Sequence, residues 1–181
     1  DSASNIPGAV TSGLNEAVDI TITDNVTFAQ AKVIEDALNS RNISYNISDT
    51  AALIEAGISS DIAVINLAGT VEANTNANKA EANAIGGATK AISYNILDTG
   101  SNVASIDTNA LNEAINIEIS GTALVSEAVI VDNVSNSGTD TYSITDSAAN
   151  LALSSNALLT KATTVIANTQ ATGSEATIIG G

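Results

Sequence analysis

Alternation of apolar and polar residues marks a series of short strands along the chain. Around the three tyrosines, Tyr45, Tyr94 and Tyr142, every second residue is apolar, as in Ile-Ser-Tyr-Asn-Ile at 43–47. A period of two places alternate side chains on opposite faces of a pleated strand. The pattern therefore predicts half-buried strands, with Ile and Tyr toward a core and Ser, Thr and Asn toward solvent.

A second kind of alternating segment lies between these tyrosine strands. Its polar face carries Asp, Thr, Asn or Glu, and it occurs at positions 18–22, 71–73, 115–119 and 165–167. Interleaving both kinds puts strand centres near 20, 45, 71, 94, 117, 142 and 165. The elementary step is therefore about 24 residues, which lies in the range of solenoid repeats. Two unlike steps make one larger repeat.

Between the strands the apolar spacing becomes helical. After the tyrosine strands, or in the equivalent place, we expect helices at 13–17, 62–67, 108–114 and 155–162, although Ile-Ala-Val-Ile-Asn-Leu at 62–67 has the composition of a strand. After the second kind of strand we expect helices around Gln30-Ala31, Glu81-Ala82, Glu127-Ala128 and Glu175-Ala176. We interpret Gly86-Gly87 and Gly180-Gly181 as helix C-caps and turns.

Four aspartates, Asp1, Asp49, Asp98 and Asp146, give the length of the larger repeat. The phrases that they open are Asp-Ser-Ala-Ser-Asn, Asp-Thr-Ala-Ala-Leu, Asp-Thr-Gly-Ser-Asn and Asp-Ser-Ala-Ala-Asn. A nearly fixed period, here about 48 residues, is typical of a unit that stacks on copies of itself. We therefore read 1–181 as a single array with repeats 1–48, 49–97, 98–145 and 146–181.

The period and the strand pattern together predict an α/β fold, a right-handed β-α solenoid with parallel strands in register. A strand, a short helix and the next strand within about 24 residues leave too little chain for a doubly wound sheet with long crossovers. Parallel strands would stack about 4.8 Å apart, with helices on one face and a polar ladder on the other. Turns of about 24 or about 48 residues both fit the pattern, and we favour the shorter.

Composition limits the classes of partner that the chain is expected to bind. Apolar residues make up 44% of the chain and aromatics 2%, which suits narrow coils filled by Ala, Ile, Val and Leu. The net charge is −15, and the basic residues stand singly at Lys32, Arg41, Lys79, Lys90 and Lys161. This predicts no nucleic-acid partner and leaves cations or basic molecules possible. Apolar runs are far shorter than the roughly 20 residues that span a bilayer, so we expect no membrane insertion.

The repeated aspartates are also the candidates for a cation site. One carboxylate per repeat beside hydroxyl groups could gather the oxygen ligands of calcium, although the Gly-Gly-x-Gly-x-Asp motif is absent. The alternative that we favour is helix capping, in which Asp or Ser before a helix accepts from free N–H groups and contributes about 1 kcal/mol. We therefore assign no metal-binding or cofactor-binding residues and expect no cofactor, with calcium left open.

Catalysis has little support in the residue types. The chain has no His and no Cys, and its acidic residues are spread by the repeat instead of meeting in one cleft. We assign no catalytic residues and expect that the chain is not an enzyme. The polar strand face, with Ile166 as its one large apolar exception, is interpreted as solvated. The glycosylation sequons at Asn25, Asn42, Asn46 and Asn133 are expected by chance in a chain rich in Asn, Ser and Thr.

The two ends of the sequence lack distinct capping repeats. Asp1 stands where a tyrosine strand would just have ended, and Gly181 stands where the next would begin. Independent solenoids usually close their open strand edges with atypical terminal repeats. We therefore expect either an interior segment of a longer array or a subunit that stacks end to end.

The phrases Tyr-Ser-Ile-Thr-Asp-Ser-Ala-Ala-Asn-Leu at 142–151 and Tyr-Asn-Ile-Ser-Asp-Thr-Ala-Ala-Leu at 45–53 carry a family resemblance. They resemble the Asp-Thr-Ala-Ala-Asn-Leu repeats of very large secreted bacterial surface proteins, of the adhesin and type I secretion kind. The resemblance implies an extracellular or cell-surface location and a structural or adhesive role. We expect a rigid spacer or self-assembling module. The alternatives are a subunit of an extracellular filament and a calcium- or glycan-binding adhesive module.

Overall fold

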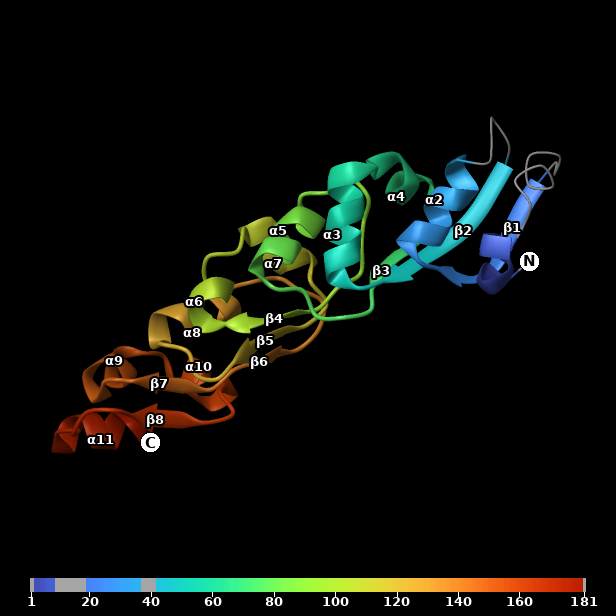
Figure 1. The fold of residues 1–181 in the computed structure, drawn as a ribbon. Coiled ribbons are helices and arrows are strands. Elements are labelled where there is room, and N and C mark those ends of the chain that lie inside the picture. The colour runs from blue at the N-terminus through green and yellow to red at the C-terminus, as the bar shows by residue number, and fades with distance from the viewer. Residues whose placement is uncertain (1, 9–18, 37–41, 181) are drawn as a thin grey trace. The chain divides into compact units, whose positions relative to one another are not determined.

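The structure is a computed structural model that describes residues 2–8, 19–36 and 42–180 (Figure 1). The chain divides into two compact units. Unit 1 comprises Asp1–Asn76 and Ala84–Tyr94, and unit 2 comprises Ala77–Asn83 and Asn95–Gly181. Both units mix helices with parallel strands, which confirms the predicted α/β class.

Unit 1 holds a three-stranded parallel sheet in the order β1-β2-β3. Helix α2 packs on β1 and β2, and α4 packs on β2, on one side of the sheet (Figure 1). Its elements in chain order are the 3-10 helix η1 (Ala3–Gly8), β1 (Asp19–Val26), α2 (Phe28–Asp36), β2 (Asn42–Asp49), α3 (Ala51–Ser60), α4 (Ile62–Leu67) and β3 (Val71–Ala73). Helix α5 (Lys79–Gly86) is shared between the two units.

Unit 2 holds two small parallel sheets, in the orders β4-β5-β6 and β7-β8. No closed barrel forms among the described strands. Its elements are β4 (Ile96–Thr99), α6 (Gly100–Val103), α7 (Thr108–Glu113), β5 (Ile117–Ser120), α8 (Val125–Asp132), β6 (Asp140–Thr141), β7 (Ile144–Asp146), α9 (Ala148–Leu153), α10 (Asn156–Lys161), β8 (Val165–Ala167) and α11 (Gly173–Ile179). Below, a layer means one strand with the helix or helices that follow it.

The alternation read from the sequence sets which face of each strand is buried. Buried and exposed residues alternate along β3 and β5, and the three tyrosines are only 1 to 2% exposed. The Tyr45 hydroxyl donates a hydrogen bond to the Val64 carbonyl oxygen in α4, at 2.9 Å. Each tyrosine ring is thus a large core side chain, and that of Tyr45 joins its strand to the helical side of the layer.

The polar face of the strands makes bonds of its own between layers. In unit 1 the Asn46 Oδ1 accepts a hydrogen bond from the Thr70 N–H at 2.9 Å. In unit 2 the Asn95 Oδ1 accepts from the Asn116 Nδ2 at 2.8 Å, and the Asn116 Oδ1 accepts from the Thr139 N–H at 2.9 Å. Asparagine at these positions therefore ties one strand to the next while remaining on the solvent side. Ile166, the predicted exception on this face, is 49% exposed.

The pairing departs from simple register opposite the tyrosines. In unit 1 Thr21 pairs with Ser44 but Asn25 pairs with Asn46, so β1 advances further along the chain than β2 between the two pairs. In unit 2 Glu118 pairs with Thr141 and Ala123 with Ile144, which is the same change of register. Extra residues on one strand form a bulge that interrupts the ladder. The strand expected around position 142 is consequently split into β6 and β7, and around 94 a bridge at Ser93 precedes β4.

The helical segments are confirmed wherever the structure describes them. The strand-like residues 62–67 form α4, because a helix buries Val64 and Ile65 against the core while its other side faces solvent. The expected helices around Gln30, Glu81, Glu127 and Glu175 are α2, α5, α8 and α11. Gly86 ends α5, and Gly180 is the C-cap of α11 with a φ of −96°. The helix expected at 13–17 lies outside the described residues.

None of the helices that the structure describes has the length and apolar character needed to cross a bilayer.

Burial of the tyrosines predicts a delayed alkaline titration. Burial, assisted by nearby acidic charges, raises the pKa of Tyr45 and of Tyr142 from 10.0 to about 12. Unfolding restores the ordinary value, so the free energy of unfolding falls as the pH rises above 10, where the unfolded state loses these protons first. Ultraviolet absorbance of tyrosinate in a Tyr94→Phe variant should show ionisation near pH 12 when folded and near 10 in urea. A reversible transition of the folded protein near pH 10 would contradict this.

Candidate functional site

The repeated aspartates form the most regular polar arrangement in the structure. Asp49, Asp98 and Asp146 end or nearly end a tyrosine strand, and each binds two backbone N–H groups. One oxygen accepts from the next residue along the chain, at 2.7 to 2.9 Å. The other accepts from the first residue of a helix 19 or 21 residues earlier, at 2.9 to 3.0 Å, and these donors are Phe28, Lys79 and Val125. Each carboxylate therefore fastens its layer to the helix of the preceding layer.

The predicted capping role is confirmed in kind, but the helix was wrongly assigned for aspartate. The helices after two of the tyrosine strands are capped by the hydroxyl of the next residue, Thr50 for α3 and Ser147 for α9, whereas the equivalent Thr99 makes no side-chain capping bond to α6. The aspartate turns back to the helix before it, since its strand packs beside that helix. Asp1, the first of the four, lies outside the described residues.

Threonine performs the same task in the alternate layers. The Ala51 N–H, at the start of α3, donates to the Thr75 Oγ1 at 3.0 Å. The Ala148 N–H, at the start of α9, donates to the Thr169 Oγ1 at 2.9 Å. Because the first N–H groups of a helix have no partner inside it, both kinds of layer supply one to their predecessor. Sequence reasoning missed this bond, although Asn-Thr at 74–75 and 168–169 was a visible shared signal.

The electrostatics of the aspartates follow from these bonds. Burial raises the pKa of the Asp146 carboxyl, but hydrogen bonds from the Asn150 amide and the Val125 and Ser147 N–H groups outweigh it, so that the pKa lies below 3.8. The pKa of Asp98 is lowered in the same way, by Asn102, Lys79 and Thr99 against the effect of burial. Both carboxylates are charged at neutral pH and are already held by N–H donors.

The acidic side chains do not gather into a metal site in the described part of the chain. Among those residues no three His, Cys, Asp or Glu side chains come together in a way that could hold a metal ion. The arrangement that does recur, one carboxylate with two N–H donors, does the chemistry of a helix cap. It offers no adjacent nucleophile and base.

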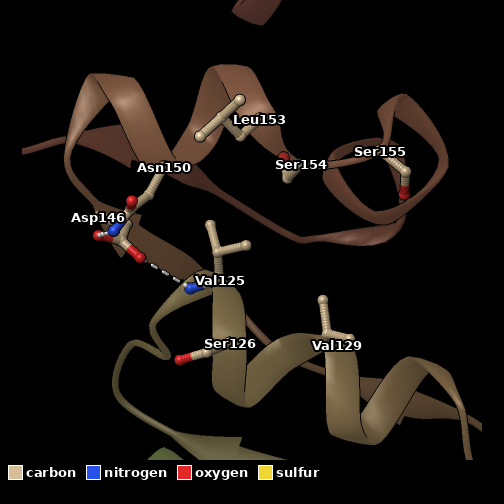
Figure 2. A pocket seen from close by; sticks show the side chains of 8 residues that line it. All are labelled: Val125, Ser126, Val129, Asp146, Asn150, Leu153, Ser154 and Ser155. Carbon is tan, nitrogen blue, oxygen red and sulfur yellow. Dashed lines mark hydrogen bonds between the residues drawn. The ribbon is translucent and has the colours of Figure 1, made fainter.

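Figure 2 shows a pocket of about 390 Å³ in unit 2. Its lining comes from the N-terminal turns of α8 and from the segment that runs from β7 through α9 to α10: Val125, Ser126, Val129, Asp146, Asn150, Leu153, Ser154 and Ser155. Leu153 is 87% exposed, and the Asp146 carboxylate is hydrogen-bonded to the Val125 N–H (Figure 2). The pocket is therefore a partly apolar hollow between two layers.

A comparison of equivalent positions explains why the pocket exists. Phe28 and Val125 hold equivalent places in different repeats, because each begins a helix and donates its N–H to the repeat aspartate. In unit 1 the Phe28 ring lies against Gly57, where an added Cβ would stand 2.7 Å from the ring. The offset that leads from Phe28 to Val125 leads from Gly57 to Ser154. Val125 thus stands where unit 1 has the Phe28 ring, and Ser154 stands where unit 1 has Gly57, which leaves room for that ring. The smaller Val125 side chain leaves part of this space empty.

Comparison of the chain with protein-family models, with curated proteins and with solved structures gave no match.

Removing the negative oxygen of Asp146 should weaken the contact between layers. In Asp146→Asn the amide group faces an N–H donor, so one charge-assisted hydrogen bond becomes a repulsion between donors. We expect the free energy of unfolding to fall by about 2 kcal/mol, measured by urea denaturation. The matched control is Asp107→Asn, at an exposed N-cap without a side-chain capping bond, which should change it by less than about 0.5 kcal/mol. Equal effects would contradict an interlayer role.

The pocket explanation predicts that two substitutions are coupled. Val125→Phe alone places a ring against the Ser154 side chain, and Ser154→Gly alone removes the Ser154 Oγ bond to the Leu151 carbonyl oxygen. Together they recreate the unit 1 arrangement. In a double-mutant cycle measured by urea denaturation, the double variant should be more stable, by about 1 kcal/mol in free energy of unfolding, than the sum of the two single changes predicts. Simple additivity would show that the two positions do not share this space.

Proposed function

We propose that this chain is a structural repeat segment of an extracellular surface protein, in which it acts as a rigid spacer or self-assembling module. In this proposal its layers wind as a right-handed β-α solenoid of about 24 residues per strand-helix step. The observation that carries the proposal is the recurring aspartate bond, which joins one layer to the helix of the layer before it in three places.

Mutual completion of the layers supports a mechanical role. A layer taken alone leaves helix N–H groups, strand edges and one apolar face without partners, and a neighbouring layer provides all three. Lysine adds further links between layers, because the Lys32 Nζ lies 2.9 Å from the Asp61 Oδ2 and the Lys90 Nζ lies 3.1 Å from the Gly69 carbonyl oxygen. Such a stack resists bending, since bending would break several bonds at every layer.

The surface chemistry is in keeping with a spacer. The net charge of −15 keeps neighbouring chains apart in solution, and the strand face toward solvent is mostly Ser, Thr, Asn and Glu. The extracellular location is proposed from the resemblance of the repeat phrases to those of secreted bacterial surface proteins. Open strand edges favour the filament alternative over a calcium- or glycan-binding module.

A solenoid can be tested by lengthening it from within. Residues 49–145 are duplicated so that Thr145 is followed by a second copy beginning at Asp49, which preserves the Thr-Asp junction. The insert contains the four strand positions near 71, 94, 117 and 142. A solenoid should gain about 19 Å in its longest dimension, four strand spacings, in small-angle X-ray scattering. Its cross-sectional radius of gyration should not change.

The matched control is a duplication of residues 61–145, which breaks the phase of the repeat at its junction. It should lower the melting temperature, because the layer at the junction then lacks residues 50–60, which form helix α3 and its Thr50 cap. Growth of the in-phase variant in all directions, with a larger cross-section, would overturn the solenoid and with it the spacer function.

A further inference from the structure

Two copies of one segment differ sharply in exposure. Residues 71–87 and 165–181 match at a constant offset, with identical residues at more than half of their positions. In the first copy the apolar positions Val71, Ala73, Ala77, Ala82 and Ile85 are 0 to 4% exposed. In the second, Val165, Ala171 and Ile179 are only half-buried, Ala167 and Ala176 are exposed, and α11 has no buried residue.

What covers the first copy is a tyrosine strand. In unit 1 the Ala73 N–H donates to the Ser93 carbonyl oxygen at 2.9 Å, and the Ser93 N–H donates to the Val71 carbonyl oxygen at 3.0 Å. In unit 2 the Ala77 N–H donates to the Asn95 carbonyl oxygen at 2.7 Å, and the Leu97 N–H donates to the Ala77 carbonyl oxygen at 3.1 Å. The residues that carry this coverage read Ile-Ser-Tyr-Asn-Ile-Leu-Asp, at 92–98.

The second copy offers the same groups at an unshielded edge. Within the described part of unit 2, β8 pairs with β7 and with no other strand, and α11 packs against α9 (Figure 1). The backbone groups of Val165 and Ala167 are those that, by alternation, point away from β7. Exposed strand edges are commonly blocked by Lys, Pro or a dense set of charges. Residues 162–180 contain one charged residue, Glu175, and neither Lys nor Pro.

We propose that the free edge of β8 and the apolar side of α11 form a docking surface for one further tyrosine-type strand. The occupant has the pattern Ile-x-Tyr-x-Ile-x-Asp and lies parallel to β8, bonding the backbone of Val165, Ala167 and Ala171 as residues 93–97 bond the first copy. Its two isoleucines and tyrosine cover Val165, Ala176 and Ile179. The inference rests on the repeat stacking of the proposed function and adds the identity of the next partner.

The three tyrosine strands of a second, folded molecule of this chain are not available for this role. In the described residues β2 lies between β1 and β3, β4 lies between Ala77 and β5, and β7 lies between Ala123 and β8. A second molecule would offer the edge of β1 instead. This strand carries no tyrosine, and η1 packs against it. The occupant is therefore a segment of the same repeat type that is not already paired within a folded copy of this chain, and it binds by strand addition.

The test supplies that segment at the point where the offset between the two copies would place it. A copy of residues 88–114 is appended after Gly181, which reproduces the junction after Gly87. In the control extension the copies of Tyr94 and Ile96 are replaced by Ser and Asn, with the length unchanged. Amide hydrogen exchange at Ala167 and Ala171 should be slowed about 100-fold by the first extension relative to the control.

Equal exchange in the two extended proteins would overturn the proposal. Sedimentation of the unextended chain tests whether a second molecule of the chain occupies the surface instead. Self-association that Val165→Asp abolishes would assign the surface to a second molecule and would also overturn the proposal. The internal duplication of residues 49–145 does not involve the free edge of β8. A lengthened stack whose β8 edge remains unprotected would therefore reject this inference alone, whereas failure of the duplication would reject the stacking itself.

Discussion

The fold depends on backbone N–H groups at the starts of short helices. A helix of six to ten residues has few internal hydrogen bonds, so its unpaired first N–H groups are a large part of its total. In this chain the next layer provides the acceptor, a carboxylate from a tyrosine strand or a hydroxyl from the alternate one. Each of these helices therefore depends for part of its hydrogen bonding on the layer beside it.

The same frame tolerates different side chains in equivalent places. Phe28 with Gly57 in unit 1 and Val125 with Ser154 in unit 2 occupy equivalent positions. The first pair fills the space between its layers, and the second leaves a pocket. The aspartate contacts are kept in both. The interlayer bonds fix where the elements lie, and packing of side chains decides only how well the space between them is filled.

Much of the fold could be predicted from the sequence because the repeats supply several readings of one pattern. The strands, the helices and even the strand-like segment 62–67 follow from matching each position with its equivalents. The split of the strand near 142 could not be predicted, since a bulge depends on how many residues the opposing strand inserts. The direction of the Asp146 bond was also hidden, because a side chain before a helix and beside another helix has the same sequence signature in either role. The pocket depended on one Phe position in one repeat.

The aspartate cap points in one direction along the chain, always toward the helix of the earlier layer. Five of the described helices, α2, α3, α5, α8 and α9, therefore receive a carboxylate or hydroxyl oxygen from the layer that follows. Because these contacts all run in the same direction along the chain, the succession of layers has a polarity. A module cut out and reinserted in its own orientation would regain both contacts, whereas two copies joined tail to tail would leave the helices at their junction without these acceptors.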